Sequence, residues 1–559
     1  MYIIYGTASL CQREFKPLQS SVNPWNPLES FQIMSKTQFA ISYLSKIKIL
    51  FLVLLMLGIF FRFVNIDKKN YWRDEALTSL QMSGYTQKEF IQQAFNGQII
   101  TPEDLQKYQR IGPEKSLTDT INALATETPE HPPLYYIMVR LWTQTFGNFV
   151  AIIRSLSALI SLLAFPCIYW LCMELFDSSI VGGMGVGLIA VSPFHVQYAQ
   201  QTREYSFWTV TTLLSSAVLL QAIRVKTRVS WAIYAATLMI GLYSHSFFVF
   251  VAIGHGLYIL ITSNFRFTKT LISFLLASIV GFITFIPWIW TTIYHLPEVN
   301  RSMEWTNAKT TLLELLKIWL INIKSIFFDL EIPKIPYFSL FNSLLLCITL
   351  LICYSIYFLC RHTQKQVWLF VLILIISNSL PLMLPDVILG GTRSISARYW
   401  IPCYLGIHLS IAYLFATKIA SVEISQLRNF WKIIIAIVIS AQVLACAVNT
   451  NIIVFISSNQ FQSENLSQVI NQTNHPLVVS SDYRYSPTEL LSLSYLLDSK
   501  VRLQLVKSSD LPNIPNKFSD VFVYSPFGLP PLWQNELPKK YNLEPIKELI
   551  NLWKLTKIN

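Results

Sequence analysis

The sequence predicts a mainly helical membrane protein, a bundle of many spans followed by a small α/β domain. Of its 559 residues, 53% are hydrophobic and 13% are charged, whereas a soluble globular protein carries about 25% charge. Apolar runs long enough to cross ~30 Å of hydrocarbon recur along most of the chain. After about residue 456 this pattern gives way to short strand-like and helix-like periods. These three observations predict the fold class.

The candidate spans are apolar runs separated by short polar loops. Eleven such runs are evident, and a mean hydropathy of +0.44 agrees with a chain that lies largely in a bilayer. They cover residues 47–64, 153–175, 179–193, 205–222, 230–246, 248–264, 270–290, 339–360, 366–385, 399–417 and 432–455.

Residues 133–147 do not fit this count. They are apolar but contain Arg140 and are followed by Asn148. Counted as one span, they would reverse the orientation of everything that follows. We expect a short helix lying at or dipping into the outer face. The alternative is that these residues cross the membrane and that a second short crossing restores the orientation. The expected number of spans is therefore about 11 to 13.

Basic residues in the short loops predict the orientation. The net charge is +12, and most of the basic residues lie in such loops. This distribution is typical of residues that set the membrane orientation and contact lipid headgroups, and not of a nucleic-acid surface. The loops alternate consistently between the two sides of the membrane if residues 1–45 and four basic loops lie inside. The outer side then receives residues 65–131, 194–204, 291–338, 386–398 and the C-terminal tail. Residues 1–45 show no cleavable signal pattern, and the true start could be Met34.

The predicted organisation has three parts. Residues 1–45 form a cytoplasmic segment, which could be disordered. Residues 46–455 form the transmembrane domain, whose first outer loop is 65–131. Residues 456–559 form an extracytoplasmic α/β domain, with strands near 476–481, 501–506 and 521–524 and a helix from Ser486.

Five unusual polar clusters all fall on the predicted outer side. Ions at a membrane surface are costly unless they have a role. Each cluster alone could be structural, as a simple ion pair, a helix-end histidine or an interfacial anchor, but five on one face favour a site. They are Asp74-Glu75, Glu130-His131 before two prolines, Tyr198 to Tyr205 with Arg203, His245, and Arg393 with Arg398-Tyr399.

Carboxylates and arginines that face each other suit one reaction class. A carboxylate can take the proton from an acceptor as it attacks a sugar carbon. Arginines can hold a phosphate bidentately and stabilise its charge as it leaves. Seven of the eight cysteines lie in or beside apolar runs without Cys-x-x-Cys spacing, which is typical of packing residues.

These motifs resemble the GT-C membrane glycosyltransferases. The resemblance rests on the acidic pair after the first run, Glu-x-Pro-Pro at Glu130, Ser-Pro with Gln-x-x-Arg-x-Tyr, Tyr-x-His, and the late Arg-Tyr. Within that fold, the sequence is similar to the protein mannosyltransferase and lipid A aminoarabinose transferase branch (glycosyltransferase family 39/83-like). The resemblance covers roughly residues 45 to 455.

The resemblance implies that Asp74 is the catalytic base and that Glu130 contributes to the same site. It implies a polyprenyl- or dolichyl-phosphate sugar as donor and inversion at the anomeric carbon. In one respect the chain departs from the aminoarabinose transferases, which have Lys where this chain has His131. That departure puts a phosphate contact at this position, and the lipid A acceptor, in doubt.

The sequence therefore predicts a multi-pass glycosyltransferase of the bacterial inner membrane, with its active site and C-terminal domain on the periplasmic side. It would move a sugar from a polyprenyl phosphate to a lipid, glycan or protein acceptor. Asp74 and Glu130 are the expected catalytic residues. The expected substrate-binding residues are Glu75, His131, Tyr198, Arg203, Tyr205, His245, Arg393, Arg398 and Tyr399.

No cofactor is expected to be required. Glu130, His131 and His245 could converge on a divalent ion, but their spacing fixes no geometry. The alternative function is a polytopic transporter or flippase for an amphipathic lipid. Transporters usually place charges at mid-membrane on broken, repeated helices, and the sequence shows neither feature.

Overall fold

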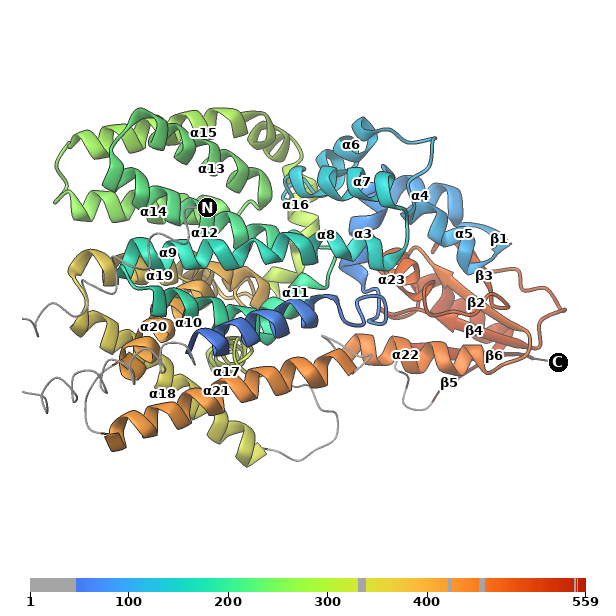
Figure 1. Cartoon of the computed structure of the whole chain (residues 1–559). Coiled ribbons are helices and arrows are strands. Elements are labelled where there is room, and N and C mark those ends of the chain that lie inside the picture. Colours follow the sequence, from blue (N-terminus) through green and yellow to red (C-terminus); the bar gives the residue numbers. More distant parts are fainter. Residues whose placement is uncertain are drawn as a thin grey trace, which may run out of the picture. The chain divides into compact units, whose positions relative to one another are not determined.

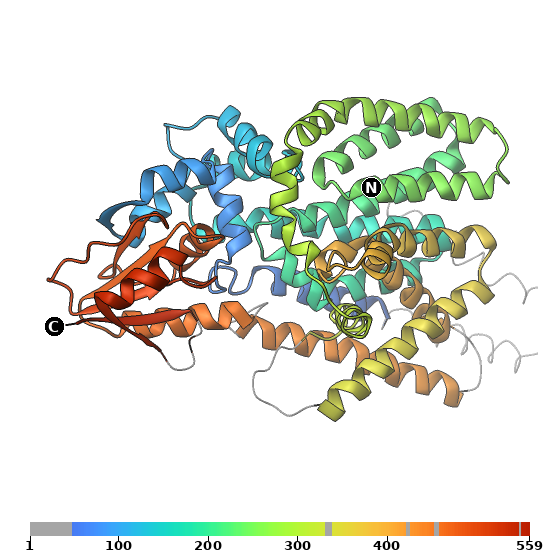
Figure 2. The same cartoon turned by 180° about the vertical axis from the view of Figure 1, so that it is seen from behind.

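The computed structural model describes residues 47–329, 338–420, 425–451, 458–546, 549 and 551–558. Helices predominate in them, and a six-stranded sheet lies at one end of the long helices (Figures 1 and 2). The predicted fold class, a helical bundle with a small C-terminal α/β part, is confirmed. The N-terminal segment 1–45 and the alternative start at Met34 lie outside the described residues.

Each apolar run predicted as a span forms helix in the part of the chain that the structure describes. The first helix covers residues 47–63. The others are α8 (Val150–Leu162), α9 (Ala164–Phe176), α10 (Ser179–Ala190), α11 (Pro193–Ala199), α12 (Tyr205–Val225), α13 (Arg228–Ser244), α14 (Phe248–Thr262), α15 (Lys269–Tyr294), α18 (Phe338–His362), α19 (Lys365–Leu389), α20 (Ile401–Ala420) and α21 (Ser425–Asn451).

The number of spans stays a prediction. Among the described residues, seven helices are long and apolar enough to cross a membrane. The pair α10 and α11 is bent by 61° and would be an eighth if it counts as one span. The bend falls where Pro193 starts α11, because a proline cannot continue the preceding helix. With 17 and 15 residues, α13 and α14 are shorter.

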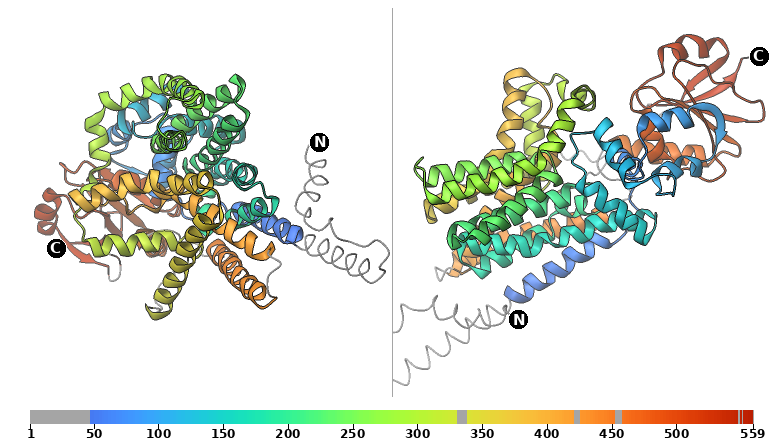
Figure 3. Two further views of the ribbon diagram at one scale, coloured as in Figure 1. Left: turned by 90° about the vertical axis from the view of Figure 1, so that its left-hand side faces the viewer. Right: turned by 90° about the horizontal axis from the view of Figure 1, so that it is seen from above.

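The centre of the bundle is formed by α12 and α20. The most apolar window is 83% buried in α12 and 78% buried in residues 397–420, against 28% in α15. Small and hydroxyl side chains on α12 let neighbouring helices approach closely. Accordingly α12 contacts α8, α9, α13, α14 and α20, and the long helices run side by side in Figure 3.

The hydrophilic stretch after the first helix folds into short elements. They are α3 (Arg73–Met82), α4 (Gln87–Ala94), β1 (Asn96–Ile100), α5 (Pro102–Gln106), η2 (Lys107–Gln109) and α6 (Leu117–Glu127). The next helix, α7 (Leu134–Phe146), confirms the helix predicted near 133–147. Arg140 in α7 is buried and donates to the Met82 carbonyl at 2.9 Å and to Thr120 at 3.0 Å. It therefore ties α7 to this outer stretch.

The predicted outer loop 291–338 also contains helices. They are α16 (Leu296–Ser302), η3 (Glu304–Asn307) and α17 (Leu312–Lys324). A capping box at Thr311 and Glu314 starts α17. After α19, η4 (Ala397–Trp400) leads into α20. Sequence reasoning treated both segments as loops and missed these elements.

The sheet has the strand order β1-β3-β2-β4-β6-β5. Its C-terminal elements are α22 (Ser458–Asn471), β2 (Pro476–Ser481), α23 (Ser486–Leu493), β3 (Arg502–Val506), β4 (Asp520–Tyr524), α24 (Pro531–Glu536), η5 (Leu537–Lys539), β5 (Tyr541–Pro545) and β6 (Leu552–Lys557). β2 runs parallel to β3 and β4, and the remaining pairs are antiparallel. The strands predicted near 476, 501 and 521 and the helix from Ser486 are confirmed.

The first outer loop contributes a strand to this sheet. β1 pairs with β3, so that Ile100 lies opposite Leu503. On one face, Val478 and Leu503 pack in a core with Phe90 and Tyr108 of the first outer loop. The opposite face packs around Trp533. One domain is thus built from two distant segments, which the predicted division at residue 456 did not anticipate.

A buried ion pair fixes the start of α3 on the bundle. Both oxygens of Glu75 accept from Arg154 of α8, at 2.9 and 2.7 Å, and neither side chain is more than 1% exposed. Arg154 also donates to the carbonyls of Ile66, Lys69 and Asn70. The backbone N–H of Thr202 donates to Glu75 at 2.8 Å. The pair therefore joins three segments.

Glu75→Gln should destabilise the protein strongly, because it leaves the Arg154 guanidinium buried without its counter-charge. Breaking such a pair costs about 3–5 kcal/mol. The free energy of unfolding, measured by denaturant titration in mixed micelles, should fall by about that amount. Glu536→Gln is the control, because Glu536 and its partner Lys539 lie at the surface, 35% and 66% exposed, and such pairs contribute only about 0–1 kcal/mol. Equal losses in both variants would contradict this reading.

Candidate active site

Asp74 lies in the first turn of α3, where the free N–H groups of a helix favour acidic side chains. Its Oδ2 accepts a hydrogen bond from Nη1 of Arg398 in η4 at 2.7 Å. Nε of Arg73 lies 3.6 Å from Oδ1. The two partners Asp74 and Arg398 are 324 residues apart in the chain. The fold thus joins a carboxylate and a guanidinium group from distant clusters.

The charges around Asp74 keep its carboxyl ionised. Burial raises the pKa of Asp74, but the guanidinium groups of Arg398, Arg73 and Arg203 and the nearby His131 outweigh burial and lower the pKa from 3.8 to about 2. Asp74 is therefore a carboxylate at neutral pH. Because a base with so low a pKa is weak, these guanidinium groups also restrain the ability of Asp74 to accept a proton.

Aromatic rings surround the Arg398 guanidinium group. The rings of Trp72, Tyr205 and Tyr399 have their centroids 5.5–5.7 Å from its Cζ. Such faces stabilise a cation without neutralising it. Nε of Arg398 is buried and has no hydrogen-bond partner among the described residues. The side chain is thus held in place with donor capacity left over.

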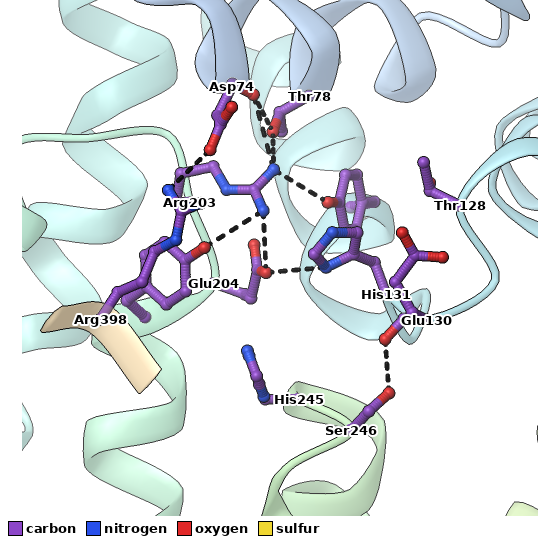
Figure 4. A network of polar contacts seen from close by, with 12 residues as sticks. Asp74, Thr78, Thr128, Glu130, His131, Arg203, Glu204, His245, Ser246 and Arg398 are labelled. Atoms are coloured by element: carbon purple, nitrogen blue, oxygen red, sulfur yellow. Dashed lines mark hydrogen bonds and ion pairs between the residues drawn. The ribbon is translucent and has the colours of Figure 1, made fainter. Parts of the chain in front are cut away.

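Arg203 is the centre of the polar network drawn in Figure 4. Its Nη1 donates to Thr78 Oγ1 at 2.9 Å and to the Tyr136 hydroxyl at 3.3 Å. Its Nη2 donates to Glu204 Oε1 at 3.1 Å and to the Tyr205 hydroxyl at 3.4 Å. Arg203 is 3% exposed and therefore joins α3, α7 and the start of α12.

Glu204 connects Arg203 with the first outer loop. His131 Nδ1 lies 3.0 Å from Glu204 Oε1. Burial raises the pKa of Glu204, but Arg203 and His131 hold it well below its usual range. The second oxygen of Glu204, Oε2, is buried without a partner among the described residues. A buried carboxylate oxygen without a donor is costly, so this atom is available to a bound molecule.

Glu130 lies beside His131, at the far side of the network from Asp74 (Figure 4). Ser302 donates to its Oε1 at 2.5 Å, and its Oε2 is buried without a partner among the described residues. Its backbone carbonyl accepts from Ser246. Glu130 and Asp74 thus lie on opposite sides of one group of polar side chains, and the link between Glu130 and the network is its neighbour His131.

His245 presents another unpaired nitrogen to the cluster. Its ring stacks on Trp208 with a centroid distance of 4.1 Å and an interplanar angle of 6°. Its Nδ1 accepts from the Phe247 backbone at 3.1 Å, so a neutral ring carries its proton on Nε2. This Nε2 is buried and has no partner in the described part of the chain. The Tyr205 and Tyr399 rings lie 6.0 and 6.4 Å away.

Most of the predicted site residues come together. Tyr198 packs edge-on against Tyr205 at 5.1 Å and completes the aromatic wall. Two predicted residues do not join the cluster. Glu75 is fully buried against Arg154, and Arg393 donates to Asp386 at 3.2 Å, to the Gly390 carbonyl and to Asn307. Their contacts favour a structural role for Glu75 and Arg393.

Sequence reasoning assigned no site role to several members of the cluster. Glu204 follows Arg203 in a recognised motif, and Trp72 and Arg73 directly precede the acidic pair. Arg73 also reaches the α/β domain, with Nη1 3.9 Å from Glu489 Oε1 and its guanidinium group 5.4 Å from the Tyr485 ring. Their position next to a recognised motif was the available signal for these three, with charge as a further signal for Glu204 and Arg73. No local signal pointed to Glu489.

Within the described ranges, no group of three or more His, Cys, Asp or Glu side chains could hold a metal ion. A divalent ion shared by Glu130, His131 and His245 has no such group to support it. That no cofactor is required stays a prediction.

Comparisons with known proteins agree with this fold. A family model described as dolichyl-phosphate-mannose-protein mannosyltransferase matches residues 130–290, less than half of the chain. These residues include Glu130, His131, Arg203, Glu204 and His245. A comparison of the sequence with curated proteins finds no match.

Solved structures are similar to this chain to different degrees. ArnT from Cupriavidus metallidurans bound to undecaprenyl phosphate is similar with a TM-score of 0.51 and 12% identity, over 90% of this chain and 97% of that protein. The apo state of the same protein has a TM-score of 0.48 and 12% identity, over 93% of this chain and 98% of that protein. The Archaeoglobus fulgidus oligosaccharyltransferase tethered with an acceptor peptide has a TM-score of 0.41 and 11% identity, over 67% of this chain. The match spans only 57% of that protein.

The chain therefore has the GT-C fold of membrane glycosyltransferases. Its apolar helices and this fold make it a multi-pass membrane protein. The resemblance inferred from the sequence motifs is confirmed at this level.

The low pKa of Asp74 predicts a pH-dependent contribution to stability. Because the pKa falls from 3.8 to about 2 on folding, the ion pairs of Asp74 stabilise the protein fully above about pH 4 and lose this effect as the pH falls towards about 2. The difference in Tm between wild type and Asp74→Asn should be constant from pH 5 to 7 and shrink below about pH 4. Arg398→Gln should move this loss to higher pH. A difference that is independent of pH would contradict the assignment.

Proposed function

We propose that the protein is a glycosyltransferase that moves a sugar from a polyprenyl-phosphate donor to an acceptor, with Asp74 as the general base. The observation that carries this proposal is the contact between Asp74 and Arg398 inside one polar cluster. A carboxylate for the acceptor proton and a guanidinium group for the donor phosphate are the two groups that this reaction needs.

In the proposed step, an acceptor hydroxyl or amine attacks the anomeric carbon and gives its proton to Asp74. The new bond joins the acceptor atom to that carbon, and the bond from the carbon to the phosphate oxygen breaks. The electron pair of the broken bond leaves with the polyprenyl phosphate. Attack from the face opposite the phosphate inverts the anomeric centre.

The Asp74–Arg398 contact must open in this reaction. Inversion places the sugar between the base and the leaving group, whereas the two side chains are 2.7 Å apart without donor. A phosphate that binds Arg398 competes with Asp74 for the same donors. Withdrawal of Arg398 raises the pKa of Asp74, because Arg398 is the largest of the charges that lower it. The donor would thus make Asp74 a better base as it binds.

The remaining free atoms of the cluster suit a hydroxyl-rich molecule. Glu130 Oε2 and Glu204 Oε2 are acceptors without donors, and His245 Nε2 is the nitrogen left for donation. We assign these three residues to hydrogen bonds with the sugar or the acceptor. Arg203 and His131 position Glu204. Tyr198, Tyr205 and Tyr399 form the wall that holds Arg398.

The donor class is supported by the ArnT structure, which holds undecaprenyl phosphate on the same fold. The lipid tail would lie between helices, with its phosphate at the membrane surface near Arg398. The acceptor would be a lipid, glycan or protein. We place the protein in the bacterial inner membrane, as the family resemblance implies. The distribution of basic loop residues supports an active site and an α/β domain on the periplasmic side.

Asp74→Asn tests the base. Loss of a general base lowers rates by about 10²–10⁴-fold. The rate of transfer from a radiolabelled polyprenyl-phosphate sugar to the acceptor should therefore decrease by such a factor. The yield of protein in membranes and its elution profile in size-exclusion chromatography should stay unchanged. Asp67→Asn is the matched control, because Asp67 lies in the same stretch and pairs only loosely with Lys68, at 3.3 Å. Near-normal turnover in Asp74→Asn would remove Asp74 from the role.

Two arginines test the phosphate site. Arg398→Gln should weaken donor binding by about 10–100-fold, because a charged hydrogen bond contributes about 1.5–3 kcal/mol. Arg393→Gln should leave donor binding nearly unchanged, because Arg393 is occupied by Asp386. Binding of polyprenyl phosphate to the purified variants measures both. A larger effect at Arg393 would place the phosphate elsewhere.

A further inference from the structure

An open groove lies between α13 and α15, away from the candidate active site. Its volume is about 750 Å³. Apolar and small side chains line most of it, among them Trp231, Ala236, Leu276 and Val280, and two cations, Lys226 and Arg228, stand at one end. The groove is therefore mostly apolar and has one cationic end.

Small residues on both helices create the groove. Ala232, Ala235 and Ala236 on α13 face Ala277 and Gly281 on α15. A Cβ on Gly281 would lie 3.0 Å from Leu238 Cβ, so the helices are in close contact there. Where the side chains are this short, the surface is hollow, and the bilayer must fill it.

The groove has the length of one bilayer leaflet. It extends from Arg228 to Met239 along α13, a rise of about 16 Å at 1.5 Å per residue. Half of the hydrocarbon core is about 15 Å thick. One acyl chain fits along it with a headgroup at the cationic end.

The cations at this end pair with no acidic side chain in the part of the chain that the structure describes. Residues 205–297 contain no Asp or Glu. Arg224 nearby is paired with Glu174 at 2.7 Å, but no acidic side chain among the described residues pairs with Lys226 or Arg228. Both side chains are exposed. Their charge is thus free for an anionic group at the membrane surface.

The cationic end of the groove is distant from the candidate active site. His245 follows the C-terminal end of α13, whereas Arg228 is its first residue. Seventeen helical residues separate the two ends by about 25 Å. A donor phosphate at Arg398 therefore lies near the opposite surface of the membrane, since α13 joins the two.

We propose that this groove binds an anionic glycerophospholipid, with its phosphate between Lys226 and Arg228 and one acyl chain along α13 and α15. Basic pockets between helices at the cytoplasmic surface are suited to such headgroups. A zwitterionic lipid would bring a cation next to these two, which disfavours it. The lipid packs the hollow between the helices and thereby stabilises α13, whose other end carries His245.

The test uses the full chain in detergent, with phosphatidylglycerol and phosphatidylcholine of identical acyl chains as probes and native mass spectrometry as the readout. The wild type should retain phosphatidylglycerol preferentially, and phosphatidylglycerol should raise its Tm more than phosphatidylcholine does. Lys226→Gln with Arg228→Gln should weaken phosphatidylglycerol binding by roughly thirtyfold. Lys226→Arg with Arg228→Lys keeps both charges and should retain binding.

Two matched controls separate a site from general attraction. Arg266→Gln with Lys269→Gln removes the same charge from the neighbouring loop, outside the groove, and should leave binding within about twofold. Ala236→Phe fills the groove and should abolish retention, whereas Val229→Phe, on the same helix outside the groove, should not. Equal losses in test and control variants would overturn the proposal. So would equal retention of both lipids, or displacement of phosphatidylglycerol from the groove by polyprenyl phosphate.

Discussion

The buried pair of Glu75 and Arg154 is the constraint on which the outer part of the structure depends. Charges removed from water are tolerated only when they are fully paired, and Arg154 satisfies one carboxylate and three carbonyls at once. The start of α3 is therefore held against α8 and against the loop before α12. That arrangement presents Asp74, the preceding residue, to Arg398.

Two adjacent carboxylates consequently have different tasks. Successive residues on a helix point about 100° apart, so Glu75 faces the bundle while Asp74 faces the polar cluster. Glu75 has both oxygens occupied by protein donors. Asp74 is 14% exposed, and its contact with Arg398 can be exchanged for substrate. The same network leaves single oxygens of Glu130 and Glu204 free, which is the pattern of a site that awaits a ligand.

Much of the site could be predicted from the sequence. The clusters at Asp74, Glu130, Arg203, His245 and Arg398 were recognisable because ions beside apolar runs are rare and stand out locally. The role of Glu75 could not be predicted, because its partner Arg154 lies inside a segment that reads as an ordinary span. Arg393 has its partner, Asp386, in the same predicted outer loop, but no local pattern shows that the two side chains pair. Glu489 could not be predicted either, since it reaches Arg73 only through the packing of α23 on α3.

The sequence by itself determined the apolar helices, their basic loops and three of the six strands of the sheet. These features follow from hydrophobic periods and charges that act over a few residues. Only the tertiary structure decided which carboxylate meets which guanidinium group, and that β1 completes a sheet some 400 residues away in the chain. Such pairings depend on the packing of whole helices, because no local pattern carries the geometry of a distant partner.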